Sequence, residues 1–185
     1  MIIKNKIKNN QSSTIWISGV TASGKTTLGK FIFESLKNKG IKKIKFFDGE
    51  DLRKRLDKSY GHSLAERYEV LNGIIKIVKE ETKIGYTVII STVSHKREMR
   101  DLARSQSNHF MEINLICSSK TCAIRDYKNI YNTINEKNNE CLPGVTEPYE
   151  ISDNAELILD TEQYSLEESK IIILNTTLKF LNDKN

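Results

Sequence analysis

The stretch ISGVTASGKTTLGK, residues 17–30, contains two glycines separated by four residues and followed directly by Lys-Thr. The segment before it, Thr14–Ser18, is rich in β-branched and aromatic residues and predicts a buried parallel strand. Apolar residues then recur at helical spacing as far as Gly40, which predicts a helix over 25–39. A strand that turns through such a loop into a helix limits the fold severely, because this context defines the phosphate-binding loop of α/β proteins.

The loop has the chemistry to hold a triphosphate. Successive backbone N–H groups and the positive end of the helix dipole converge on one anion, and a side chain at Gly19 or Gly24 would obstruct its approach. Lys25 supplies a positive charge for the β- and γ-phosphates, and the Thr26 hydroxyl can ligate Mg²⁺. We therefore predict an ATP and Mg²⁺ site formed by Gly19, Ala22, Ser23, Gly24, Lys25, Thr26 and Thr27.

Strand and helix patterns alternate along the rest of the chain. Further strands are predicted at 43–48, 86–92, 110–117 and 155–160, and helices at 63–83, 96–105, 120–126 and 166–181. This alternation predicts a single α/β domain over 1–185, with a P-loop NTPase-like parallel sheet of about five strands flanked by helices. The polar residues 1–13 are expected to form a frayed lead-in.

Residues 129–152 interrupt the alternation. This segment contains both prolines, Gly144 and several asparagines, and connections of this length are usually functional or disordered. We predict a mobile, lid-like loop that closes over the nucleotide, with a surface excursion of no catalytic role as the alternative.

Composition excludes several classes of protein. The three cysteines, Cys117, Cys122 and Cys141, show no CxxC spacing, which predicts a reduced, cytoplasmic protein without a structural zinc site. No apolar run approaches the roughly 20 residues of a membrane span. The net charge of +5 comes from scattered lysines and by itself suits either nucleic acid or small anionic nucleotides. The motifs favour a small nucleotide, and no nucleic-acid or membrane partner is expected.

The group that receives the phosphate should lie at the carboxyl ends of the neighbouring strands. The second strand ends in FFDGEDLRKRL, with Asp48 at its tip and Arg53 about one helical turn further on. A carboxylate there can accept the proton of an attacking hydroxyl or orient Mg²⁺ through water, or it can simply cap a helix. The third strand ends in STVSHKREMR, which places Ser94 near the same edge.

Arginines add positive charge around this edge. Arg97 and Arg100 share one helix face and could hold an anionic substrate, although such a pair is more often a solvated surface. Arg67 contributes a further guanidinium group. Arg125 precedes the predicted lid, where it could stabilise charge on the transferring phosphate.

Six segments, in order, resemble the adenylylsulfate kinase family. GVTASGKTT is similar to its phosphate loop, FFDGEDLR to its Asp-Gly-Asp-Asn-x-Arg block and GHSLAERYE to its Gly-Phe-Ser-x-x-x-Arg-x-Glu block. VSHKREMR, RDYKNIY and LPGVTEPYE resemble three further blocks, so that the likeness covers roughly residues 15–161. The family transfers the γ-phosphate of ATP to the 3′-hydroxyl of adenosine 5′-phosphosulfate, and the resemblance implies this reaction and a homodimer.

The resemblance also implies residue roles. Asp48 takes the position of the acidic residue that activates the 3′-hydroxyl, Arg53 and Arg67 match arginines that hold the nucleotide substrate, and Lys128 matches a lysine of the lid. Ser94 corresponds to a serine described in the family as a phosphoserine intermediate. Because in-line transfer from ATP needs no covalent step, we instead expect Ser94 to line the acceptor pocket.

The chain departs from the family where the acceptor's base should bind. His62 replaces a phenylalanine of the base-stacking wall, Val70 an asparagine and His95 the proline after the serine, while Asn129 replaces a glycine of the lid. Phosphates are recognised by charge, whereas a base is recognised by shape and hydrogen bonds, so these changes are typical of a changed acceptor.

Two acceptors and one non-enzymatic function remain open at this point. The acceptor is adenylyl sulfate, or another nucleotide such as cytidine diphosphoramidate from the pathway of bacterial capsule phosphoramidate. His62 and Val70 would suit the smaller pyrimidine pocket of the second. The third hypothesis is a catalytically silent nucleotide-binding module, against which the intact Lys25, Thr26 and Asp48 argue.

Overall fold

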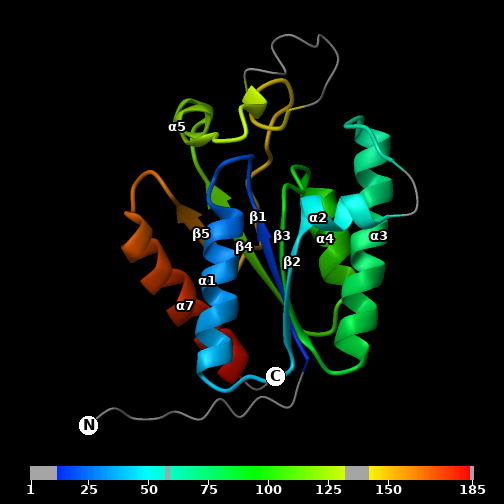
Figure 1. The fold of residues 1–185 in the computed structure, drawn as a ribbon, viewed down its shortest axis with the longest axis vertical. Coiled ribbons are helices and arrows are strands. Elements are labelled where there is room, and N and C mark those ends of the chain that lie inside the picture. The colour runs from blue at the N-terminus through cyan, green and yellow to red at the C-terminus, as the bar shows by residue number, and fades with distance from the viewer. Residues whose placement is uncertain (1–11, 57–58, 132–141, 184–185) are drawn as a thin grey trace.

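A parallel sheet forms the centre of the molecule (Figure 1). The computed structural model describes residues 12–56, 59–131 and 142–183, and in this part of the chain the sheet has five strands. β1 is the central strand, and the chain adds strands first on one side of β1 and then on the other. In sheets of this kind, ligands bind beyond the carboxyl end of the strand at which the order reverses, which here is β1. In spatial order the strands are β2 (Ile44–Asp48), β3 (Thr87–Thr92), β1 (Thr14–Ser18), β4 (Phe110–Ile116) and β5 (Leu157–Asp160).

Helices cover both faces of the sheet (Figure 1). One layer contains α1 (Lys25–Asn38) and α7 (Leu166–Asn182), and the other contains α3 (Leu64–Lys83) and α4 (Arg97–Ser105). Side chains of β1 alternate between the two layers, as the strand period requires: Ile15 and Ile17 join the core under α1, while Trp16 joins the core under α3. The central strands β1, β3 and β4 are therefore buried on both faces, whereas Ile158 of the edge strand β5 is exposed.

Two short helices lie at the carboxyl end of the sheet. α2 (Gly49–Arg55) follows β2, and α5 (Ser119–Arg125) follows β4. In Figure 1 they lie on either side of the loop that joins β1 to α1. This end of the molecule therefore collects the elements from which a site can be built.

The α/β fold class predicted from the sequence is confirmed. Every predicted strand and helix is present. The largest difference between predicted and observed bounds is two residues, at the start of β5 (155 predicted, 157 observed). The periodicity did not predict α2 as an element, although the capping alternative for Asp48 implied a helix there. Asp48 is indeed the N-cap of α2, with its Oδ1 accepting a hydrogen bond from the Glu50 N–H at 3.0 Å.

Part of the predicted lid is anchored to the body of the protein. The Glu150 N–H donates to the His95 carbonyl oxygen at 2.9 Å, and the Asn114 amide donates to the Tyr149 hydroxyl. Residues 142–152 are thus packed against β4 and the segment before α4. Of the predicted lead-in at 1–13, residues 1–11 lie outside the described residues, whereas Ser13 is buried and shares a hydrogen bond with His109 rather than being frayed. Residues 132–141 of the predicted loop, which include Cys141, also lie outside the described residues.

A buried ion pair joins α4 to β4. Arg100 Nε lies 2.9 Å from Glu112 Oε1, and each side chain is 1 % exposed. Arg100 also donates to the Ser94 carbonyl oxygen at 2.6 Å, while Arg97 pairs with Asp153 at the surface. The hypothesis that Arg97 and Arg100 share an anionic substrate is therefore wrong for Arg100, whose guanidinium group is neutralised inside the core.

None of the described helices combines the length and the apolar character needed to cross a membrane.

Glu112→Gln should lower the free energy of unfolding by about 3–5 kcal/mol, because the Arg100 charge would stay buried without its carboxylate. The quantity is measured by urea denaturation. Asp153→Asn is the matched control, since it removes the exposed Arg97–Asp153 pair and should cost less than about 1 kcal/mol. Losses of equal size in the two variants would contradict a structural role for the buried pair.

Candidate active site

The loop between β1 and α1 has the backbone that phosphate binding requires. Ala22 and Gly24 both adopt the left-handed conformation, with φ of 61° and 97°, and α1 begins directly after Gly24. A Cβ on Gly24 would meet no atom within 4 Å, so a side chain there would project into the open space at the helix start. A Cβ on Gly19 would instead lie 2.8 Å from the Leu115 carbonyl oxygen, so the protein's own packing, rather than the anion's approach, requires that glycine.

Lys25 is held inside this loop. Its side chain is 9 % exposed, and its ammonium group donates a hydrogen bond to the Val20 carbonyl oxygen. Burial lowers the pKa of Lys25 to about 8, although the neighbouring Asp48 carboxylate acts in the opposite direction. A buried ammonium with a depressed pKa would gain from the arrival of an anion.

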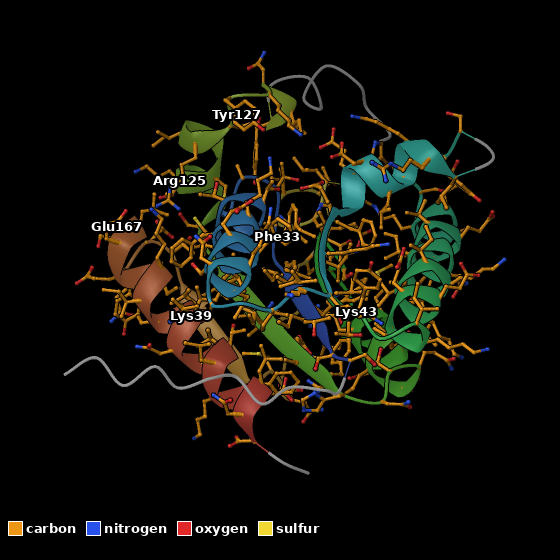
Figure 2. The ribbon with its side chains drawn as sticks, turned by 60° about the horizontal axis from the view of Figure 1, so that its bottom comes forward. Phe33, Lys39, Lys43, Arg125, Tyr127 and Glu167 are labelled. Carbon is orange, nitrogen blue, oxygen red and sulfur yellow. The ribbon has the colours of Figure 1, made fainter. Side chains whose placement is uncertain are left out.

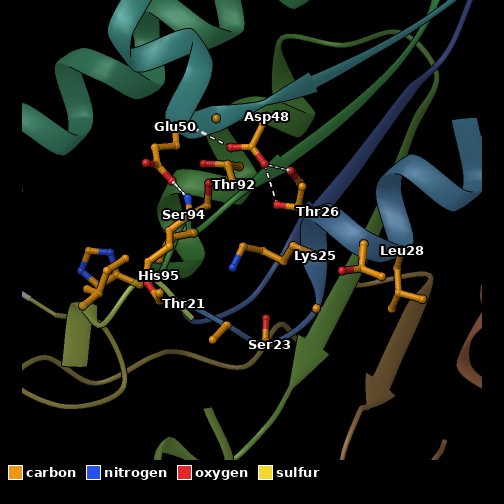
Figure 3. A pocket seen from close by; sticks show the side chains of 18 of the residues that line it. Thr21, Ser23, Lys25, Thr26, Leu28, Asp48, Glu50, Thr92, Ser94 and His95 are labelled. Carbon is orange, nitrogen blue, oxygen red and sulfur yellow. Dashed lines mark hydrogen bonds and ion pairs between the residues drawn. The ribbon is translucent and has the colours of Figure 1, made fainter. Parts of the chain in front are cut away.

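Thr26 and Asp48 meet where α1 begins and β2 ends (Figure 3). The Thr26 hydroxyl donates to Asp48 Oδ2 at 2.6 Å, and the Ser91 hydroxyl donates to the same oxygen at 3.1 Å. The second contact follows from the parallel register, which pairs Asp48 with Ser91. Burial raises the pKa of Asp48, but these hydrogen bonds and that from the Glu50 N–H outweigh it, so its pKa lies below the ordinary value. The carboxylate is therefore ionised at neutral pH.

This pair of oxygen ligands suits Mg²⁺, which prefers carboxylate, hydroxyl and water oxygens. Among residues 12–56, 59–131 and 142–183, no group of three or more His, Cys, Asp or Glu side chains could hold a metal ion. A Mg²⁺ ion at Thr26 would therefore take most of its remaining ligands from phosphate groups and water, as is usual for this metal.

A cavity of about 1160 Å³ opens at this end of the sheet. Apart from Gly19 and the candidate pair Arg97 and Arg100, every predicted site residue lines it. Cavities that hold one small molecule usually measure roughly 300–1,000 Å³, so this volume suits two ligands at once. The cavity extends from the phosphate loop to the face of α3 that carries Arg67, Val70, Leu71 and Ile74.

Two arginines lie at the far end of the cavity from α1. Arg67 donates from Nε to the His62 carbonyl oxygen at 3.1 Å, and Arg53 donates to the Tyr60 carbonyl oxygen at 3.4 Å. Burial, and then the positive charge of Arg67, lower the pKa of Arg53. Two neighbouring guanidinium groups of like charge inside a cavity favour an anionic ligand between them. Val70, 6 % exposed, adds an apolar wall beside them.

The segment after α5 reaches across the loop. The Tyr131 hydroxyl donates to the Thr21 carbonyl oxygen at 3.0 Å, and Lys128 forms an ion pair with Glu50 of α2. Residues 128–131 therefore connect the two sides of the cavity, as a lid would.

Arg125, for which a role at the transferring phosphate is predicted, lines the cavity and forms hydrogen bonds with the segment that follows β5. It donates to the Thr161 side chain at 3.1 Å and to its carbonyl oxygen at 2.8 Å. Figure 2 shows Arg125 and Tyr127 together at the end of the molecule that carries α5. In this conformation Arg125 supports the wall formed by the residues that follow β5.

That wall is the part of the site that sequence interpretation missed. Thr161, Glu162 and Tyr164 all line the cavity. Thr161 directly follows β5, so the rule that drew attention to Asp48 at the end of β2 could have found it. No sequence signal indicated the contact of Tyr131 with the phosphate loop.

Comparison with known proteins agrees with this arrangement. A model of the adenylylsulphate kinase family matches residues 11–160. An adenylyl-sulfate kinase of Oceanobacillus iheyensis is 31% identical over 182 residues, covering 96% of this chain and 88% of that protein. One of Thermodesulfovibrio yellowstonii is 29% identical over 183 residues, covering 98% of this chain and 89% of that protein.

Solved structures show the same likeness. The APS kinase CysC of Mycobacterium tuberculosis, in complex with AMPPNP and APS, superposes with a TM-score of 0.80 at 25% identity, covering 91% of this chain and 99% of that one. A gluconokinase of Sinorhizobium meliloti superposes with a TM-score of 0.58 at 17% identity, covering 94% and 93%, which shows a shared fold alone.

The affinity for a nucleoside triphosphate should fall as the pH rises above about 8, because Lys25 must be protonated to pair with phosphate and burial holds its pKa there. The expected decrease is roughly tenfold per pH unit once Lys25 is mostly neutral. Calorimetric titration with a non-hydrolysable ATP analogue between pH 7 and 9.5 measures it. Lys25→Met should bind more weakly at every pH without this decrease, and an equal decrease in that variant would assign the titration to another group.

Proposed function

The chain belongs to the adenylylsulfate kinase family, and from this we propose that it transfers the γ-phosphate of ATP to the 3′-hydroxyl of a nucleotide, with adenylyl sulfate as the acceptor. The observation that supports the proposal best is the cavity with two different ends. One end is a phosphate loop with Lys25 and Thr26, and the other combines Arg53 and Arg67 with the apolar wall of α3.

The loop end would bind ATP. The N–H groups at the start of α1 and the Lys25 ammonium would surround the β- and γ-phosphates. The contact of Lys25 with phosphate would replace its present hydrogen bond to the Val20 carbonyl oxygen. Thr26, with Asp48 beside it, would hold Mg²⁺. When bound, the ion supplies positive charge that offsets the charge developing on the phosphoryl oxygens.

The α3 end would bind the acceptor. Arg53 and Arg67 would pair with its anionic tail, and its base would lie against Val70. Lys128 would close the lid over both ligands through its ion pair with Glu50. Asp48 lies between the two ends and would orient or deprotonate the attacking hydroxyl, since its depressed pKa keeps it ionised.

A second acceptor, cytidine diphosphoramidate, is favoured by one observation. Val70 is buried in the cavity wall and His62 also lines the cavity, at the two positions where the resemblance places an asparagine and a phenylalanine. An apolar side chain in place of an amide removes a hydrogen bond by which a base could be recognised. This change favours an acceptor with a different base that undergoes the same phosphoryl transfer.

The proposal is tested by incubating the protein with MgATP and either adenylyl sulfate or cytidine diphosphoramidate and following ADP release. Turnover with adenylyl sulfate is the expected result, and Lys25→Ala should abolish it because a charge on the transferring phosphate is lost. Turnover with only the cytidine compound would identify the second acceptor. No turnover with any nucleotide would favour a silent nucleotide-binding module.

Asp48→Asn should lower kcat by roughly 100-fold or more and change the affinity for ATP much less, because the carboxylate acts on the acceptor hydroxyl. Steady-state kinetics and ATP titration measure the two effects. Ser91→Ala is the matched control, since it removes one hydrogen bond to the same oxygen and leaves the carboxylate in place. A loss of ATP affinity as large as the loss of kcat would assign Asp48 to the metal instead.

The homodimer implied by the resemblance stays a prediction, which light scattering on the purified protein would check.

A further inference from the structure

The segment that links β3 to α4 carries an unusual backbone. Ser94 has a φ of 38°, a conformation that residues other than glycine rarely adopt. Two contacts hold it there: Arg100 donates to the Ser94 carbonyl oxygen at 2.6 Å, and the Glu150 N–H donates to the His95 carbonyl oxygen at 2.9 Å. Strained residues of this kind persist where the surrounding structure maintains them, and they gather at ligand sites.

The side chains of this segment are buried without partners. Ser94 is 6 % exposed and His95 is 0 % exposed. Within the described residues, neither the Ser94 hydroxyl nor either ring nitrogen of His95 has a hydrogen-bond partner. Both residues nevertheless line the large cavity. Because buried polar atoms are almost always paired in native proteins, three unpaired atoms on two consecutive cavity-lining residues indicate that a ligand supplies the missing partners.

The surroundings of His95 indicate which part of a ligand it would contact. Burial, and then the positive charges of Arg67 and Lys96, lower its pKa to about 4, so the imidazole is neutral at physiological pH. A neutral imidazole offers one donor and one acceptor, which suits the uncharged edge of a base. The anionic tail has better partners in Arg53 and Arg67.

The position of His95 agrees with this assignment. Val70 of α3 and Met99 of α4 belong to one apolar cluster and both line the cavity, and His95 is close enough to α3 to feel the charge of Arg67. This end of the cavity therefore combines an apolar wall, against which a flat ring can pack, with polar atoms that have no partner in the protein.

We propose that His95 is a specificity residue that hydrogen-bonds the edge of the acceptor's base, with the Ser94 hydroxyl directed to the same ligand. The inference rests on the proposed function, in which a nucleotide occupies this end of the cavity. The resemblance places a proline at position 95, and a proline side chain has no polar atom. The hydrogen bond is thus a feature that this chain adds, and it bears directly on which base is accepted.

Three variants of the full chain test the proposal. His95→Leu removes both ring nitrogens, His95→Asn keeps a polar group near Nδ1, and His95→Gln keeps one near Nε2. With ATP saturating, His95→Leu should lower kcat/KM for the preferred acceptor roughly tenfold and leave the KM for ATP unchanged. One of the two amide variants should restore kcat/KM to within about threefold of the wild type.

Base analogues give a readout that a purely structural role would not change. The wild type should prefer its acceptor roughly tenfold over an analogue whose base lacks the exocyclic amino group or the adjacent ring nitrogen. His95→Leu should lose this preference, because the His95 substitution and the change in the base each remove the same hydrogen bond. Their effects on kcat/KM are therefore not additive.

His109→Leu is the matched control. His109 is the other buried histidine of the described residues, where it stacks on Phe180 at 4.1 Å and shares a 2.8 Å hydrogen bond with Ser13, outside the cavity. Its replacement should lower Tm but leave the preference among acceptors intact.

Three outcomes would overturn the proposal. The first is an active enzyme in which His95→Leu leaves kcat/KM unchanged. The second is an active enzyme in which all three His95 variants lose kcat/KM equally toward every acceptor and toward ATP. Either result would leave the proposed function standing and rule out the role of His95. If the folded wild type phosphorylates no nucleotide, the proposed function itself fails and the role of His95 fails with it.

Discussion

The hydrogen bond from the Thr26 hydroxyl to the Asp48 carboxylate connects the two halves of the site. Thr26 belongs to the first turn of α1 and Asp48 to the last position of β2, and 22 residues separate them in the chain. They meet because β1, β3 and β2 are parallel and adjacent, so that their carboxyl ends lie at one edge of the sheet. The phosphate loop, the cap of α2 and the hydroxyl of Ser91 all depend on that arrangement.

Charge is divided along the cavity in a way that matches phosphoryl transfer. The loop end has a buried ammonium and an ionised carboxylate, which suit phosphate and Mg²⁺. The α3 end has guanidinium groups for an anion, and next to them a neutral imidazole and an apolar wall. This division fits the proposed transfer, in which two ligands of different chemistry would occupy one cavity with their reacting groups near Asp48.

The buried polar groups of α4 and β4 support this site indirectly. Arg100 is neutralised by Glu112 and holds the carbonyl oxygens of Ser94 and Glu150. One guanidinium group thus fixes both the strained segment that contains Ser94 and the anchored part of the predicted loop.

Asn129 has a φ of 57° at a position where the resemblance places a glycine. Asparagine is among the few residues that adopt this conformation readily, so the backbone there tolerates the replacement.

The sequence by itself determined the local elements, the phosphate loop and the family. Strand and helix periods depend on near neighbours along the chain, and the spacing of Gly19, Gly24 and Lys25 is enough to predict a phosphate-binding loop. Only the tertiary structure decided that Arg100 is buried rather than bound to substrate, that Arg125 contacts Thr161, and that the polar atoms of Ser94 and His95 are unpaired. These facts depend on contacts between residues far apart in the chain, and no periodic pattern encodes the partner that packing places beside a side chain.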